Sequence, residues 1–375
     1  MRRSIRATAG FVVMAVVALG LVGCGQSGGE AESALARVGG ATPPPTLPLA
    51  TEAAGVAESL AGVVGTDEPT ESSTTTLEPP TSPVPVPTTE VPVAIPVAPP
   101  LVSPPSRPVP GGTGVYAGLG TWIDAYDWSR TFGKDGPLVE VDDIDRMADL
   151  GVQTLYVQTS RWNAPTDILE PERLVPLIER ARQRGMGVVA WYLPTFVDPA
   201  TDLRRLLAAA TLDVDAVAVD IESRDVVDTA ERNRRLVALS RDVRQGLPGM
   251  ALGAIVFPPV VMEVINTSFW PGFPWAEIEP FYDVWVPMAY QSFRTEASGY
   301  RDGGRYTAEN IDRLRAHVGD DAVVHTVGGI ADATTGDDVD GMVAAAAERG
   351  AIGGSLYDWR TTSPALWPHL RAFRR

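Results

Sequence analysis

The stretch at residues 215–222 constrains the fold of this chain more than any other. Branched apolar residues occupy every second position, and small residues followed by two carboxylates occupy the positions between them. Because side chains alternate across a β-strand, one face would be apolar, and the other small at its start and acidic at its end. A parallel (β/α) barrel suits such a strand, since small residues pack inside it and the carboxyl ends of its strands form the site. Asp220 and Glu222 would lie on that face, about 7 Å apart.

Strand-like and helical patterns alternate from residue 113 to residue 375. The expected strands are 115–119, 154–159, 187–192, 215–222, 252–257, 284–290, 323–327 and 352–357, and the expected helices are 142–150, 171–184, 199–210, 229–245, about 311–318, about 339–346 and 366–373. This alternation predicts an α/β fold, a (β/α)8 TIM barrel, with a doubly wound open sheet as the alternative. No Gly-x-Gly-x-x-Gly follows the first strand. We therefore expect no dinucleotide. We also expect no cofactor of another kind.

The first 23 residues have the pattern of a bacterial lipoprotein signal peptide. Arg2, Arg3 and Arg6 precede an apolar run at 11–22, and this run is short for a membrane span. Cys24, the only cysteine, follows Leu-Val-Gly, where such a signal places the residue that is lipidated. We therefore expect an extracytoplasmic protein, anchored to the bacterial cell membrane through Cys24. A plain secretory signal with an incidental cysteine is the alternative.

Residues 24–112 are expected to form a disordered tether rich in proline and threonine. The segment holds 18 of the 33 prolines and few large apolar residues. Such a composition buries too little apolar surface to offset the entropy lost on ordering. We expect a semi-rigid spacer that carries the barrel at 113–375 away from the membrane.

Charge and residue spacing exclude several classes of function. The formal net charge of −16 argues against a nucleic-acid partner. The three histidines show no ligand spacing with acidic residues, so we expect no metal site. No nucleophile elbow is present for Ser/His/Asp catalysis.

Acidic and aromatic residues follow the expected strands at their carboxyl ends. The candidate site residues there are Trp122, Asp124, Gln158, Arg161, Trp191, Tyr192, Asp220, Glu222, Tyr290, Gln291, Asp358 and Trp359. Aromatic faces stack on the apolar faces of sugar rings, and carboxylates bind hydroxyls or transfer protons. This combination predicts a carbohydrate cleft. Simple barrel packing is the alternative for the aromatic residues.

Three segments resemble the chitinase-like glycoside hydrolases of family 18. Asp215-x-x-x-x-Asp220-x-Glu222 is similar to the fourth-strand signature Asp-x-x-Asp-x-Asp-x-Glu, although Ala218 replaces the middle aspartate. Met288-Ala289-Tyr290 resembles the sixth-strand Met-x-Tyr, although Gln291 stands where an aspartate follows. Residues 354–359 resemble the eighth-strand segment that ends in a tryptophan, here Trp359.

The resemblance implies a role for each matched residue. Glu222 would protonate the glycosidic oxygen, and Asp220 would orient a 2-acetamido group whose carbonyl attacks the anomeric carbon. Tyr290 would hydrogen-bond to that group, and Trp359 would form the floor of the subsite. Two carboxylates so close together do not readily both ionise, which suits one of them to act as an acid.

The expected function is therefore a cell-surface glycoside hydrolase acting on a polysaccharide, peptidoglycan or chitin-like. A non-catalytic carbohydrate-binding barrel is the alternative that Ala218 and Gln291 favour. Lysozyme-like muramidases also carry Asp-x-Glu on a strand. A barrel that binds a protein partner, or one in which Asp220 and Glu222 form a structural ion pair with Arg161 or Arg224, stays open.

Overall fold

The computed structural model describes residues 112–133 and 136–375. The expected signal peptide, the lipidation site at Cys24 and the tether up to residue 111 lie outside the described residues. Among the helices of the described part, none is both long and apolar enough to cross a membrane.

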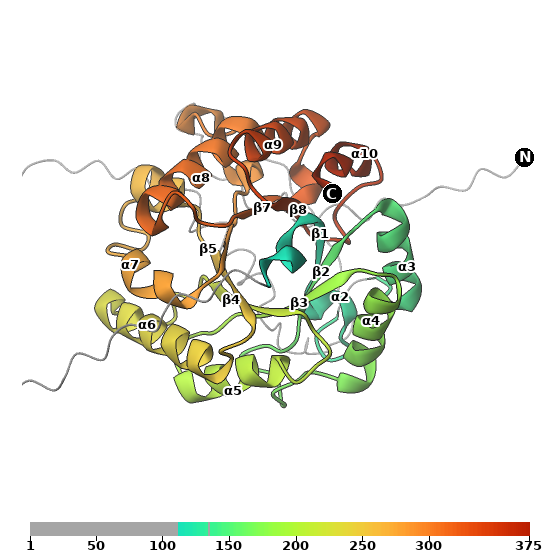
Figure 1. Cartoon of the computed structure of the whole chain (residues 1–375). Helices are drawn as coiled ribbons and strands as arrows, with labels where there is room; N and C mark the ends of the chain where they lie inside the picture. The colour runs from blue at the N-terminus through green and yellow to red at the C-terminus, as the bar shows by residue number, and fades with distance from the viewer. Residues whose placement is uncertain (1–111, 134–135) are drawn as a thin grey trace, which may run out of the picture. The chain divides into compact units, whose positions relative to one another are not determined.

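Eight parallel strands form the centre of the molecule, as predicted (Figure 1). They are β1 (Gly118–Ile123), β2 (Thr154–Gln158), β3 (Gly187–Tyr192), β4 (Ala216–Ile221), β5 (Ala251–Val256), β6 (Val284–Pro287), β7 (His325–Gly329) and β8 (Gly353–Tyr357). Hydrogen bonding joins them in the order β6-β5-β4-β3-β2-β1-β8-β7. Single bridges between Trp285 and Val324 and between Met288 and Val327 connect β6 to β7. The sheet therefore closes into a (β/α)8 barrel.

Helices surround the ring of strands in Figure 1. They are α2 (Ala125–Trp128), α3 (Val141–Leu150), α4 (Pro171–Gln183), α5 (Pro199–Ala209), α6 (Thr229–Gly246), α7 (Trp275–Ile278), α8 (Gly303–Val318), α9 (Gly336–Glu348) and α10 (Trp367–Leu370). Shorter turns are η1 (Thr113–Tyr116), the π-helical η2 (Val261–Ile265), η3 (Glu279–Phe281), η4 (Gln291–Phe293), η5 (Glu296–Ser298), η6 (Ala331–Ala333) and η7 (Arg371–Phe373).

Local sequence sets where several of these helices begin and end. Pro171 and Pro199 stand in the first turns of α4 and α5, where a missing N–H costs nothing. The Asp198 side chain accepts a hydrogen bond from the Thr201 N–H and caps α5. Gly151 ends α3 with a φ of 92°, a conformation that favours glycine. These signals hold the connections short, so that each helix returns the chain to the start of the next strand.

The first strand lies later in the chain than the sequence indicated. We expected it at 115–119, but residues Thr113–Tyr116 form η1 and the strand begins at Gly118. Tyr116 is fully buried and donates its hydroxyl to the Val217 carbonyl at 3.0 Å. A Cβ at Gly253 would lie 2.7 Å from the Tyr116 hydroxyl oxygen. The glycine on β5 therefore leaves room for a tyrosine that fills the base of the barrel.

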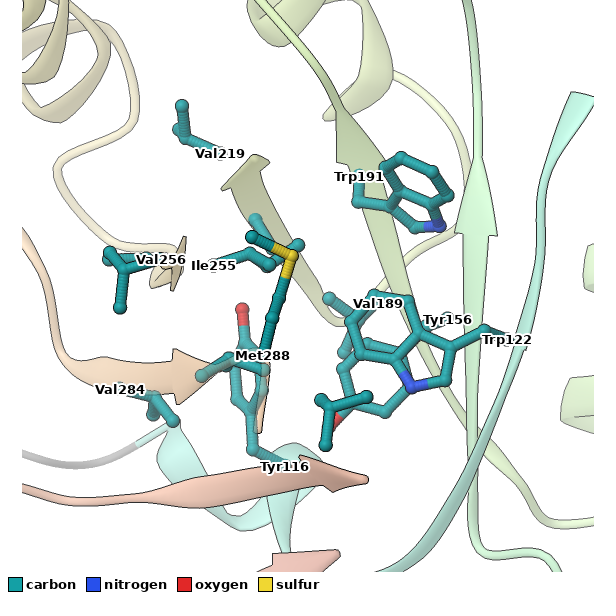
Figure 2. Packing of buried hydrophobic residues seen from close by; sticks show 14 of the residues in the cluster. Tyr116, Trp122, Tyr156, Val189, Trp191, Val219, Ile255, Val256, Val284 and Met288 are labelled. Atoms are coloured by element: carbon teal, nitrogen blue, oxygen red, sulfur yellow. The ribbon is translucent and has the colours of Figure 1, made fainter. Parts of the chain in front are cut away.

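A chain of hydrogen bonds runs through the barrel interior from η1 to β1. His325 Nδ1 donates to the Tyr116 carbonyl at 2.8 Å, and its Nε2 accepts from the Ser355 hydroxyl at 2.9 Å. Ser355 Oγ accepts from Trp122 Nε1 at 2.8 Å. The Trp122 ring stacks on Tyr156, with centroids 4.1 Å apart (Figure 2). Burial lowers the pKa of His325 to about 4, so this histidine is neutral at physiological pH.

Candidate active site

The strand β4 places Asp220 on the inner face of the barrel, at its carboxyl end. Ala218 aligns with Trp191 of β3, whose ring lies 6.0 Å from the interior ring of Trp122. Asp220 lies two residues beyond Ala218 and shares its face. It is buried, whereas Glu222, the first residue after the strand, is partly exposed. The small residues that precede Asp220 leave the interior to the large rings of β1, β2 and β3.

Tyr290, just after β6, lies beside both β4 carboxylates. Burial raises the pKa of its phenol well above the usual range, and the charges of Glu222, Asp220 and Asp358 raise it further. The phenol is therefore a hydrogen-bond donor throughout the physiological pH range. Its ring lies 6.2 Å from that of Tyr357 at the end of β8. Residues from β4, β6 and β8 thus meet at one mouth of the barrel.

A second group of acids lies at the ends of β1 and β8. Carboxylate oxygens of Asp124, Asp127 and Asp358 all lie within 4.8 Å of one another. Asp124 accepts hydrogen bonds from the Tyr126 and Asp127 N–H groups and from the Tyr357 hydroxyl, the last at 2.7 Å. Asp127 accepts from the Asp124 N–H at 2.9 Å, which completes a capping box at α2. We call these three residues the β1/β8 acid cluster.

Burial and mutual repulsion raise the pKa values in the β1/β8 acid cluster. Burial is the largest cause for all three residues, and for Asp358 it acts with the charge of Asp124 to raise the pKa to about 6. The charge of Arg360, whose Nη1 lies 3.7 Å from Asp127 Oδ1, opposes this rise. Close, buried carboxylates do not all ionise, so the cluster holds at least one proton near pH 6.

The β1/β8 acid cluster is also within reach of a single cation, although the sequence indicated no metal site. Each of its carboxylates already accepts at least one hydrogen bond from the protein, from Tyr357, from the Asp124 N–H or from the Thr361 N–H. These bonds occupy part of the lone-pair capacity that a cation would need. Proton sharing is therefore the chemistry that this donor set favours.

Two of the predicted polar residues position the segment that carries Asp124. Gln158 Oε1 accepts from the Ala125 N–H at 2.9 Å. The Arg161 guanidinium lies over the rings of Tyr126 and Phe132, 4.2 and 4.9 Å from their centroids. The charge of Arg161 also lowers the pKa of Asp124, against the larger effect of burial. Both side chains are buried, so they act on the mouth mainly through the β1–α2 connection.

Other predicted site residues lie apart from this group. Tyr192 follows the inward-facing Trp191 and points to the opposite face, where its hydroxyl donates to Asp202 of α5 at 2.8 Å. Gln291 is buried and its amide donates to the Thr334 hydroxyl at 3.3 Å. The Trp359 ring lies 5.5 Å from that of Trp367 on α10. The ring that β8 brings toward Tyr290 is Tyr357 instead.

Asp127 and Tyr357 belong to the mouth, although the motif comparison did not select them. The spacing Asp124-x-x-Asp127 ahead of a helix is a capping-box pattern, and this signal was present in the sequence. Tyr357 is the last residue of β8 and shares the inward face of Ser355. Alternation along β8 would place Trp359 on the same face, so the choice of Tyr357 over Trp359 depends on the strand ending at Tyr357.

Comparison with solved structures identifies the fold. The GH18 chitinase from Cycas revoluta in complex with (GlcNAc)3 superposes with a TM-score of 0.51 at 12% identity, over 68% of this chain and 99% of that one. Its complex with allosamidin gives 0.51 at 13% identity, over the same shares of the two chains. The spore cortex-lytic enzyme SleL of Bacillus cereus gives 0.48 at 11% identity, over 69% of this chain and 75% of that one.

The chain therefore has a family 18-like chitinase fold, as the sequence motifs suggested. Neither a protein-family profile nor a curated protein sequence matches it. At identities this low the similarity concerns the fold, so any activity has to be argued from the residues at the mouth.

Proposed function

We propose that this barrel is a glycoside hydrolase that cleaves a polysaccharide containing 2-acetamido sugars, peptidoglycan or chitin-like. One observation carries the proposal. Asp220 and Glu222 stand at the carboxyl end of β4, and the charges of both act on the phenol of Tyr290. Two carboxylates and a protonated hydroxyl thus meet where a (β/α) barrel has its active site.

Each of these groups suits one task in substrate-assisted hydrolysis. Glu222, which reaches solvent, donates a proton to the glycosidic oxygen as the bond to the anomeric carbon breaks. Buried Asp220 orients the acetamido group, so that its carbonyl oxygen attacks the anomeric carbon. Tyr290 donates a hydrogen bond to that group. Water then opens the cyclic intermediate, and Glu222 recovers its proton from that water.

A non-catalytic carbohydrate-binding barrel is the second candidate. Ala218 stands where the family pattern has an aspartate, and no acid replaces it inside β4. Gln291 also stands where the family pattern has an acid, and its amide donates a hydrogen bond to the Thr334 hydroxyl. Without these acids, fewer groups share the proton of Asp220, and binding without cleavage becomes the competing outcome.

Hydrolysis by the full-length protein tests the proposal. Chitobiose, chitohexaose and purified peptidoglycan would be incubated with the wild type, and new reducing ends counted. Glu222→Gln should lose about 10²–10⁴-fold in rate while still binding chitohexaose, because the amide keeps size and polarity but has no acidic proton. Glu179→Gln, on the exposed face of α4, is the matched control and should behave as the wild type.

The outcomes separate the candidates. Equal hydrolysis by Glu222→Gln and the wild type would remove Glu222 as the acid. Binding of chitohexaose without hydrolysis of any polymer would support the carbohydrate-binding barrel. A protein that neither binds nor cleaves these glycans would contradict both proposals.

We propose further that the protein is held at the outer face of the cell membrane by a lipid on Cys24. The support is the sequence alone, with an apolar run and Leu-Val-Gly before the only cysteine. Metabolic labelling with a fatty-acid analogue should mark the wild type in the membrane fraction. Equal labelling of Cys24→Ala would contradict the proposal, and Ser27→Ala serves as the control substitution.

A further inference from the structure

Arg224, on the connection between β4 and α6, stands two residues after Glu222 and has no part in the hydrolysis proposed above. It is exposed, and its guanidinium carbon lies 4.6 Å from the centroid of the Phe269 ring. The Phe269 ring meets that of Phe257 edge-on, with their centroids 4.6 Å apart. Stacking holds a guanidinium by its face, and its N–H donors lie along its edge. The two phenylalanines therefore fix the place of Arg224 on the surface.

The stack on Phe257 places Arg224 on the β4–β5 side of the mouth. Strands β4 and β5 are neighbours in the sheet (Figure 1), and Ile221 is the register partner of Val256. Glu222 and Phe257 directly follow these two residues, so they leave the two strands at the same level of the barrel. A group bound by Arg224 would therefore lie next to the proposed cleavage site.

A second arginine, Arg232 near the start of α6, lies close to Arg224. It is 3% exposed, and its guanidinium carbon lies 4.2 Å from the centroid of the ring of Trp270, the residue after Phe269. Burial lowers the pKa of Arg232, and the charge of Arg224 lowers it further. Two like charges are therefore held near each other, on successive rings of one connection. We call Arg224 and Arg232 the arginine pair.

The charge of Arg232 has no acidic partner among the described residues. Its Nη1 donates to the Val226 carbonyl at 3.0 Å and its Nη2 to the Thr229 hydroxyl at 3.3 Å, and both acceptors are neutral. Its buried Nε has no acceptor in the described part of the chain. Arg244 of the same helix, which is also buried, is instead paired with Asp283 at 2.6 Å. Because buried cations are normally paired with an anion, Arg232 brings an unneutralised positive charge to this side of the mouth.

We propose that Arg224 binds a carboxylate of the polymer beside the cleaved bond, with the charge of Arg232 behind it, and so selects an acidic glycan over neutral chitin. The proposal rests on the proposed function and narrows it, because of the two polymers named there peptidoglycan carries carboxylates and chitin does not. A planar guanidinium with two parallel N–H donors matches the two oxygens of a carboxylate. An arginine fixed in advance by ring stacking also loses little side-chain freedom on binding.

The acids at the mouth make such a cation necessary for an acidic substrate. Asp220 and Glu222 stand at the end of β4, where their charges would repel a carboxylate on the polymer. Of the other acids in the same connection, Asp228 caps α6, and Asp225 is exposed to solvent, which screens its charge. The arginine pair therefore offsets the repulsion on the side of the mouth where the β4 acids stand.

Hydrolysis of charged and uncharged forms of one glycan by the full-length protein tests this site. Peptidoglycan strands freed of their stem peptides carry a free lactyl carboxylate on every second sugar, and methyl esterification removes that charge. The kcat/KM of the wild type should fall about tenfold on esterification, whereas that of Arg224→Gln should be nearly the same on both forms. Arg224→Lys keeps the charge without the paired donors and should show an intermediate ratio. Arg241→Gln, at an exposed position of α6, is the control and should keep the wild-type ratio.

The ratio of the two kcat/KM values separates this site from the hydrolase itself, and thermal unfolding checks that each variant is folded. If the wild type cleaves both forms equally, with and without stem peptides, or if Arg224→Gln keeps the wild-type ratio, the carboxylate site is wrong while the proposed hydrolase stands. A ratio that depends on Arg224 only when stem peptides are present supports the site and assigns the carboxylate to the peptide. If the wild type cleaves no glycan, the proposed hydrolase is wrong, and calorimetric binding of the two forms decides the site, which equal binding of both to the wild type would overturn.

Discussion

The two acidic groups at the mouth of the barrel are built in different ways. Strand alternation places Asp220 beside the small residues of β4, and Glu222 follows where the strand ends. The β1/β8 acid cluster instead depends on loops, in which backbone N–H groups and the Tyr357 hydroxyl hold the carboxylates. We infer that the β4 acids are placed for chemistry on a substrate and that the β1/β8 acid cluster is part of the framework. Substitutions in the two groups should therefore affect different measurements.

The largest difference is expected at Asp220. Asp220→Asn should lower the hydrolysis of acetamido sugars about 10²–10³-fold. The amide oxygen is a weaker hydrogen-bond acceptor for the acetamido N–H than a carboxylate is, and it lacks the negative charge that stabilises the transition state. Its melting temperature should stay close to that of the wild type. Asp320→Asn, at an exposed position before β7, is the control. A similar loss of activity in the control would show that the effect is not specific to the mouth.

The next largest effect is expected for Asp358→Asn, which should raise the free energy of unfolding by an amount that depends on pH. The folded pKa is raised to about 6, so folding takes up a proton between the unfolded value of 3.8 and about pH 6. Stability from this group is present below pH 3.8 and is lost as the pH rises through 6.

Asp358→Asn removes this loss and keeps the Oδ1 acceptor for the Thr361 N–H. At pH 7 it should be more stable than the wild type by about 2–3 kcal/mol, with the difference vanishing near pH 4. Urea denaturation at both pH values measures this. A variant that is less stable than the wild type at pH 7 would show that the negative charge of Asp358 is needed for the fold.

A smaller effect on activity is expected at Tyr290. Tyr290→Phe removes one hydrogen bond to the acetamido group and should lower kcat/KM about tenfold. The loss should be smaller on a substrate without an acetamido group. Tyr300→Phe, which removes a hydroxyl bonded to Glu309 of α8, is the matched control. Equal losses on both kinds of substrate would argue that Tyr290 acts through packing.

The smallest effect is expected at Tyr357, on the opposite side of the mouth. Its hydroxyl donates to Asp124 Oδ2, so Tyr357→Phe should lower the free energy of unfolding by about 1 kcal/mol. Hydrolysis should change little if the β1/β8 acid cluster is framework. An activity loss as large as that of Asp220→Asn would instead place this cluster in the chemistry and remove the distinction between the two groups.

The sequence was sufficient for the barrel and for the β4 side of the mouth. The alternation of small and branched residues at 215–222 identified the inner face, because strand geometry depends only on neighbouring residues. The later start of the first strand, at Gly118, could not be predicted from the sequence pattern. Tyr116 is buried in η1, and an apolar pattern does not distinguish a buried turn from a strand.

The β1/β8 acid cluster could not be predicted from local patterns, because it joins residues that are far apart in the sequence. Asp124 and Asp358 become neighbours only when β8 pairs with β1, and no local pattern carries that information. The prediction that Tyr192 belongs to the site, by contrast, conflicts with a pattern that is local in the sequence. It directly follows the inward-facing Trp191, so alternation alone was enough to place its ring on the helix side.

The neutral His325 inside the barrel has a consequence for how the stability of this protein depends on pH. Its pKa is lowered to about 4 from 6.5, so folding releases a proton in that range and stability rises with pH. Asp358 has the opposite slope between 3.8 and about 6. The two slopes have opposite signs, so the contribution of His325 and Asp358 together should change less with pH than that of either group alone. Asp358→Asn removes one of the two opposing slopes, so its stability should rise more steeply with pH than that of the wild type between about pH 4 and 6.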